Sequence, residues 1–174
     1  MQKLMILTIS VCLLFSCSSN IHSIRYQNGT TVTYKLPPDW KVKNVNPPSD
    51  HFNIIEPKEF SDSYTGITID YHEKIEGKYP HTQEGNAKLY LHEIHNVKDD
   101  EVKMELLKTI SSPKYGDITI YRFYSNYFGD HLVAMVLNDT GHCVVELWRT
   151  ISDQQNLYQS EFEDVVSSIL LKHK

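Results

Sequence analysis

Apolar and polar side chains alternate on both sides of an Asn-Gly pair near the amino terminus. The stretch IRYQ precedes Asn28-Gly29 and TTVTYKL follows it, so side chains of one kind fall on one face of each extended segment. Asn-Gly readily adopts the positive φ values of a type I′ turn. The pattern therefore predicts a β-hairpin at 24–36, which Pro37 and Pro38 end.

Further extended segments follow along the chain. Short strands are predicted at 51–57, at 65–72 and from Trp40 up to Pro47-Pro48, and longer ones at 101–110, 117–126, 132–138 and 142–150. The segment 101–110 fits a helix or a strand, and the turn residues after it, Ser112-Pro113 and Tyr115-Gly116, favour a strand. LVAMVL at 132–137 is apolar on both faces, which predicts a central strand covered on both sides.

Two other segments repeat apolar residues at helical spacing. The first stripe comprises Ala87, Tyr90, Leu91, Ile94 and Val97, and the second comprises Tyr158, Phe162, Val165, Val166, Ile169 and Leu170. Ser160 with Glu163 would form a capping box for the second helix, and Ser152 with Gln155 is an earlier alternative. The order of strands, helix, strands and helix predicts an α+β domain with a mostly antiparallel sheet and helices on its faces.

Two short motifs, LPPDW at 36–40 and FEDVVSSI at 162–169, flank this pattern of elements. Together they resemble the PsbP-like α/β/α sandwich family over most of residues 24–172. The family includes an extrinsic photosystem protein, a Ran-binding import factor, DcrB-like bacterial lipoproteins and chaperones of secretion effectors. The resemblance implies the sandwich fold and a role in binding other proteins or in assembly. It implies no catalytic residue.

The amino terminus has a different pattern. Lys3 precedes about a dozen apolar or small residues, fewer than the roughly 20 that a membrane-spanning helix needs, which predicts a signal peptide at 1–16. Leu14-Phe15-Ser16-Cys17 resembles the lipobox of bacterial lipoproteins, which implies cleavage before Cys17 and fatty acyl chains on it. We therefore expect a lipidated tether at 17–23, a single domain at 24–174 and membrane anchoring in the bacterial cell envelope. Ser18, where an Asp would retain the protein in the inner membrane, implies the outer membrane, facing the periplasm.

The net charge limits the classes of possible binding partner, and the cysteine content limits the possible disulfides. The net charge is −5 without a basic cluster, and signal-peptide cleavage would make it about −6, which disfavours nucleic acid. After removal of Cys12 and acylation of Cys17, Cys143 would be the one free cysteine, so an intramolecular disulfide is excluded. Cys143 alternates with apolar residues of a predicted strand, which indicates a small buried hydrophobe.

Nine histidines raise the question of metal binding. His92 and His95 are three residues apart on the predicted helix, where the zinc-protease motif needs four, and both point away from the apolar stripe. Asp70 and His72 share one face of a strand and would suit a metal or a proton relay, but two ligands are too few for zinc. We interpret the pair as the polar face of an edge strand, and we predict no metal and no cofactor.

Catalytic motifs are absent from the sequence: there is no Gly-x-Ser-x-Gly elbow and no glycine-rich phosphate loop. This absence predicts a protein that is not an enzyme. Eleven tyrosines are an excess that core filling in a sheet or a binding surface would explain. For a partner-binding surface, we expect Tyr124, Tyr127 and Phe128 to contribute, because they lie together near one strand end.

The sequence thus predicts a lipid-anchored envelope protein that binds another envelope protein as an accessory, assembly or chaperone-like factor. One alternative is an immunity or inhibitor lipoprotein, whose acidic charge would suit a basic toxin. A second alternative is a histidine-assisted metal-binding protein.

Overall fold

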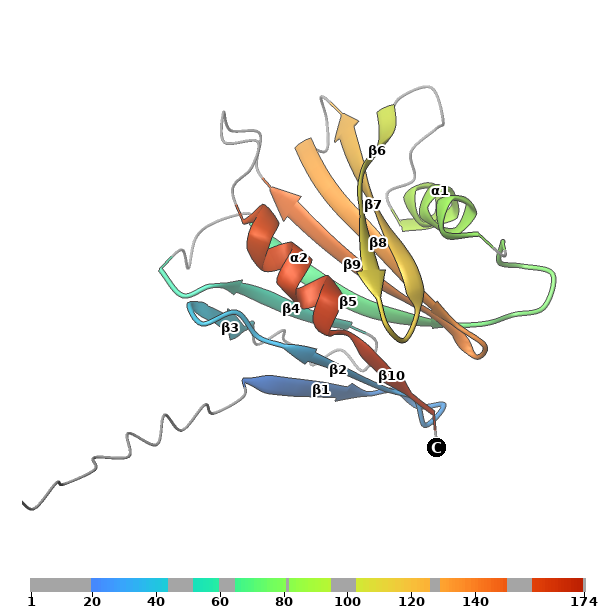
Figure 1. Cartoon of the computed structure of the whole chain (residues 1–174), viewed down its shortest axis with the longest axis horizontal. Coiled ribbons are helices and arrows are strands. Elements are labelled where there is room, and N and C mark those ends of the chain that lie inside the picture. Colours follow the sequence, from blue (N-terminus) through green and yellow to red (C-terminus); the bar gives the residue numbers. More distant parts are fainter. Residues whose placement is uncertain are drawn as a thin grey trace, which may run out of the picture.

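The computed structural model describes residues 20–43, 52–59, 65–80, 82–94, 103–125, 129–149 and 158–173. In this part of the chain, two antiparallel sheets and two helices pack together (Figure 1). The predicted signal peptide and Cys17 lie outside the described residues.

The opening hairpin is confirmed as β1 (Ile21–Arg25) and β2 (Thr31–Lys35). Its turn differs from the type I′ prediction, because Gly29 has φ 84° and Asn28 does not have a positive φ. The Gly29 N–H donates to the Tyr26 carbonyl at 3.0 Å, and Asn28 Oδ1 accepts from the Thr30 N–H at 2.9 Å. The loop is thus one residue longer than a type I′ turn, and glycine alone supplies its left-handed residue.

The larger sheet has the order β3-β4-β5-β9-β8-β7-β6. Its strands are β3 (Trp40–Val42), β4 (Phe52–Pro57), β5 (Gly66–Glu73), β6 (Lys103–Ser112), β7 (Gly116–Ser125), β8 (Gly129–Asn138) and β9 (Gly141–Arg149). The predicted strands are confirmed, including the ambiguous one at 101–110. Residues 132–136 of β8 are almost fully buried, as the doubly apolar pattern predicted.

The smaller sheet has the order β1-β2-β10, and its third strand, β10 (Leu170–Lys172), was not predicted. The apolar stripe of the last helix suggested that Leu170 continued it, but the helix ends before Ile169, whose ψ is 130°. Leu171 then pairs with Val32 and is buried, while Leu170 is 41 % exposed. Because residues 170–172 pair with β2, which is distant in sequence, their side chains alternate between buried and exposed and do not follow helical spacing.

The two helices cover opposite faces of the larger sheet (Figure 1). Helix α1 (Gln83–Ile94) lies over β7 and β8. Its residues Ala87 and Tyr90 form a cluster with the sheet residues Tyr121, Phe123, Val133, Met135 and Val144. Helix α2 (Gln159–Ser168) and the smaller sheet cover the other face through the main hydrophobic core, which includes Phe162, Val165 and Val166. The predicted α+β class with helices on both faces is confirmed.

The start of α2 differs from the predicted capping box. The helix begins after Tyr158, which has φ 61° and ψ 15° and makes no side-chain capping bond. Ser160 lies within the first turn, where its hydroxyl donates to the Glu161 carboxylate at 2.9 Å. Glu163 instead accepts from Lys108 of β6 and from Gln159. Ser152 and Gln155 of the alternative box lie outside the described residues.

Candidate functional site

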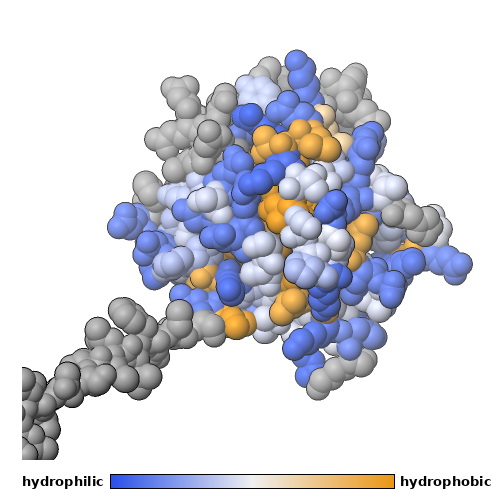
Figure 2. Space-filling model, in the orientation of Figure 1, coloured by the Kyte–Doolittle hydropathy of each residue, from blue (hydrophilic) through white to orange (hydrophobic). Residues whose placement is uncertain are grey.

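Strand β6 forms one edge of the larger sheet, and its outer side has no partner among the described strands. Most of its ten residues are exposed, and Leu106 and Leu107 are 65 % and 36 % exposed. The register with β7 shifts between Leu106 and Lys108, which marks a β-bulge. Figure 2 shows hydrophobic surface over the upper part of β6. A long edge strand with exposed leucines is a surface on which another chain can pair.

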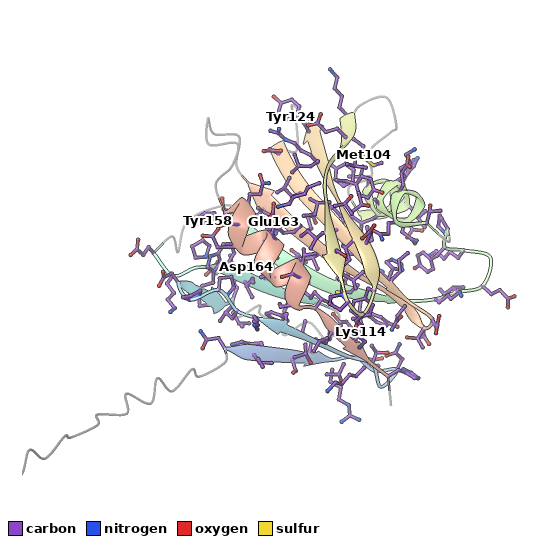
Figure 3. The ribbon with its side chains drawn as sticks, in the orientation of Figure 1. Met104, Lys114, Tyr124, Tyr158, Glu163 and Asp164 are labelled. Carbon is purple, nitrogen blue, oxygen red and sulfur yellow. The ribbon has the colours of Figure 1, made fainter. Side chains whose placement is uncertain are left out.

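Tyr124 lies beside this edge. It is in β7, opposite Lys103 of β6, and it is 45 % exposed. Leu106 pairs with Tyr121, whose side chain packs on the α1 side, whereas Tyr124 points to the α2 side. Figure 3 shows Tyr124 and Met104 near the same end of β7 and β6. The edge therefore carries large apolar side chains on both faces. Tyr127 and Phe128, the other predicted binding residues, lie outside the described residues.

Arg122 joins the Tyr124 end of β7 to β8. Its guanidinium donates to Asp130 through Nε at 2.8 Å and through Nη2 at 3.2 Å. These two bonds raise the pKa of Arg122, and Glu105 of β6 adds to the effect from 3.8 Å. A bidentate pair fixes orientation as well as charge. The Arg122–Asp130 pair thus joins β7 to β8 beside Tyr124.

Asp70 and His72 lie in β5, which pairs with β4 and β9, so the edge-strand interpretation was wrong. His72 Nε2 is 3.1 Å from Asp70 Oδ2, off the hydrogen-bonding direction, so the contact is electrostatic. Asp70 Oδ1 accepts from the Tyr71 N–H at 2.7 Å. The two side chains are only 18 % and 22 % exposed. They do share one face, as the sequence predicted.

The sequence did not reveal that His72 stacks on His142 of β9. The two rings lie 5.1 Å apart at 14°, and Tyr79 meets His142 edge-on at 5.0 Å. Burial, and then the neighbouring His72, lowers the pKa of His142 to about 4. His142 is therefore neutral at physiological pH. A pocket of about 130 Å³ lies beside His142. Its lining residues are Lys74, Tyr79, Pro80, Asn86, Leu137, Asn138, Gly141 and His142.

A second polar cluster lies on the same face of the sheet, nearer its centre. The Tyr90 hydroxyl of α1 donates to Glu146 Oε2 at 2.7 Å, and His131 Nδ1 lies 2.7 Å from Glu146 Oε1. Burial, and then the Glu146 charge, raises the pKa of Tyr90. Trp148 Nε1 donates to Thr68 Oγ1 at 2.9 Å. Burying a carboxylate is tolerated because both of its oxygens have partners.

Neither polar cluster forms a metal centre: the residues that the structure describes contain no group of three or more His, Cys, Asp or Glu side chains arranged to hold one. His92 is exposed, and His95 lies outside the described residues. Cys143 is fully buried on the opposite face, and burial followed by the Asp70 charge raises the pKa of its thiol. Such a thiol is inert, which agrees with its predicted core position.

Comparison with known proteins bears on the fold. No protein-family model and no curated protein matches the chain. Among solved structures, the chain is similar to cyanobacterial PsbP (CyanoP) from Synechocystis sp. PCC 6803, with 14 % sequence identity and a TM-score of 0.53. The match covers 88 % of this chain and 94 % of that one. This likeness confirms the PsbP-like fold. None of the helices in the described part of the chain is long and apolar enough to span a membrane.

Proposed function

We propose that this chain is a lipid-anchored envelope protein that binds another protein without catalysing a reaction, as an accessory, assembly or chaperone-like factor. The observation that carries the proposal is the β6 edge. It combines a strand whose outer side has no partner among the described strands with the exposed side chains of Leu106, Leu107 and Tyr124. A soluble fold normally protects such an edge, because it is a template for pairing with another chain.

The edge is suited to binding by strand addition. A partner strand would receive main-chain hydrogen bonds from the outer side of β6 and contact Leu106 on one face and Tyr124 on the other. Lys103, which precedes the exposed leucines, discourages nonspecific pairing and favours a partner with acidic residues, whereas Lys108 already pairs with Glu163. The bulge confines regular pairing to the two halves of the strand.

The anchor rests on the sequence LLFSC at 13–17. Two or three acyl chains on Cys17, at about 0.8 kcal/mol per buried methylene, would hold the domain at the membrane. Metabolic labelling with a fatty acid tests this step. We expect label in the full-length protein and none in Cys17→Ala. Equal labelling of the two proteins would contradict the predicted lipidation site.

The binding proposal is tested by affinity capture from native membranes with the full-length protein. We expect specific partners with the wild type, and the loss of most of them with Leu106→Lys and with Tyr124→Ala. Ile75→Lys is the matched control, because Ile75 is an exposed apolar residue in the segment between β5 and α1. Capture that is unchanged by both edge variants would refute the β6 surface. Recovery of a small basic toxin would identify the protein as an immunity factor.

A further inference from the structure

A pocket of about 230 Å³ opens where β3, the end of β4 and the start of α2 meet. Its lining residues are Pro37, Pro38, Asp39, Trp40, Pro57, Glu59, Tyr158 and Glu161. Two aromatic rings and three prolines form its walls, and three carboxylates belong to its lining. Figure 3 shows Tyr158 at the amino end of α2. The pocket is remote from the β6 edge in the sheet order, so it does not depend on the function proposed above.

The walls of the pocket are fixed by the main chain. The Trp40 N–H donates to the Pro37 carbonyl at 3.1 Å, and the Lys58 N–H donates to the Asp39 carbonyl at 2.8 Å. The Tyr158 ring meets the Trp40 ring edge-on, with centroids 5.2 Å apart at 85°. Prolines have few conformations to lose. A pocket of this kind is formed before a ligand arrives, which favours binding.

The described part of the chain provides no cationic partner for the three carboxylates of the lining. Among the residues that the structure describes, no Lys, Arg or His makes an ion pair with Asp39, Glu59 or Glu161. Lys58 is adjacent in sequence, but its ammonium donates to the Pro38 carbonyl at 2.7 Å. Burial of the Tyr158 phenol raises its pKa, and the negative charges of Glu161 and Glu59 raise it further. The electric field of both carboxylates therefore reaches the phenol.

Other glutamates of the chain show the contrast. Glu56 lies within 3.4 Å of two lysines, Lys41 and Lys43, and Glu163 is paired with Lys108. Glu56 and Glu163 thus have lysine partners, whereas the described residues leave the pocket with more carboxylates than cations. The amino end of α2 adds a partial positive charge, which Glu161 in the first turn offsets.

We propose that this pocket binds a single arginine or lysine side chain presented by a protein partner. The apolar stem would lie against the prolines, and the charged head would meet the face of Tyr158 and the carboxylates. Arginine fits best, because its planar guanidinium stacks on a ring and pairs with carboxylates at the same time. An acidic or neutral side chain would leave the excess negative charge uncompensated.

The test uses the full-length protein in detergent with the substitution Trp148→Phe, so that Trp40 is its only tryptophan. The probe is a blocked Gly-Arg-Gly peptide, and the control peptide carries citrulline, which has the shape of arginine without its charge. Choline is a third probe, because a lipid headgroup would present the same kind of cation. Tryptophan emission and equilibrium dialysis are measured in parallel, and dialysis decides if emission does not change.

We expect saturable binding of the arginine peptide and at least about tenfold weaker binding of the citrulline peptide. Asp39→Asn and Glu161→Gln should each weaken binding by about two- to fivefold, as expected for a partly exposed ion pair. Asp164→Asn is the matched control, since Asp164 is an exposed carboxylate further along α2 (Figure 3). High salt should weaken the binding of the arginine peptide to the wild type and to every variant that still binds it.

Three results would overturn the proposal. The first is no saturable binding of the arginine peptide by a protein whose thermal unfolding is normal. The second is equal binding of the arginine and citrulline peptides, or undiminished binding by the double variant Asp39→Asn/Glu161→Gln. The third is saturable binding of choline without binding of arginine, which would assign the pocket to a lipid headgroup.

Discussion

The two faces of the larger sheet bury different kinds of side chain. The face toward α2 is apolar, with Ile55, Ile67 and Ile69 fully buried beneath Phe162. The face toward α1 also buries polar groups, among them His142 and Glu146. Apolar burial is non-directional, so the first face needs only shape and volume. The second face also depends on hydrogen bonds and ion contacts such as those of Glu146 with Tyr90 and His131.

The difference between the two faces predicts two kinds of contribution to the stability of the fold. Loss of an apolar side chain should destabilise the protein equally at every pH. Loss of a polar partner should produce effects that depend on chemistry and pH.

Phe162→Ala should be the most damaging of these changes. Phe162 is fully buried between α2 and the sheet, and its truncation leaves a cavity that the surrounding strands cannot close. We expect a loss of about 3–5 kcal/mol in the free energy of unfolding, measured by urea denaturation. The loss should be the same at pH 7.5 and at acidic pH. A loss that changed with pH would contradict the view of this face as purely apolar.

Glu146→Ala should cost about 3 kcal/mol in the same measurement. The substitution removes the acceptor for the Tyr90 hydroxyl and the partner of His131, and leaves both inside the protein. Glu73→Ala is the control, because Glu73 is an exposed carboxylate on the neighbouring strand β5. Equal effects of the two substitutions would show that the buried carboxylate contributes nothing specific.

Acidification should destabilise the protein through His142. Its pKa is about 4 in the folded protein, below the ordinary value of 6.5, so only the unfolded chain binds a proton as the pH falls between these values. We expect about 2 kcal/mol less stability at pH 5 than at pH 7.5 from this group. The charged and titratable groups around it are His72, Asp70, Lys74 and Tyr79.

His142→Phe identifies this contribution, because the phenyl ring keeps the stacking on His72 and cannot titrate. The difference in unfolding free energy between the variant and the wild type should change with pH and level off above pH 7. A difference that is constant from pH 5 to pH 7.5 would assign the acid sensitivity to other groups.

Tyr90→Phe should have the smallest effect, about 1–2 kcal/mol. It removes one hydrogen bond to Glu146 but keeps the ring that packs α1 against the sheet. In the Glu146→Gln background the same substitution should cost less, because the acceptor is no longer charged. A double-mutant cycle measures this coupling, and a coupling of zero would exclude a direct contribution of the Tyr90–Glu146 bond.

Local patterns in the sequence predicted most elements of the fold. Alternation placed the strands, helical spacing placed both helices, and the apolar segment in β8 indicated a strand buried on both faces. The same patterns predicted that Asp70 and His72 share a face and that Cys143 is buried. These properties depend on neighbours within a few residues.

Other features depend on residues distant in sequence. The strand β10 exists because Leu171 pairs with Val32, and the stack of His72 on His142 exists because β5 lies next to β9. The pocket between Trp40 and Tyr158 likewise joins the two ends of the domain. No local pattern signals such pairings, because their energy comes from packing between segments.

Periodicity and composition are properties of the chain, and they specify the elements, the fold class and the acidic charge of this protein. Three other features arise only when the chain folds: β6 becomes an edge strand, β5 becomes an interior strand, and polar side chains gather beneath α1. Strand order is set by which surfaces exclude water together, and that choice is made only when distant segments meet.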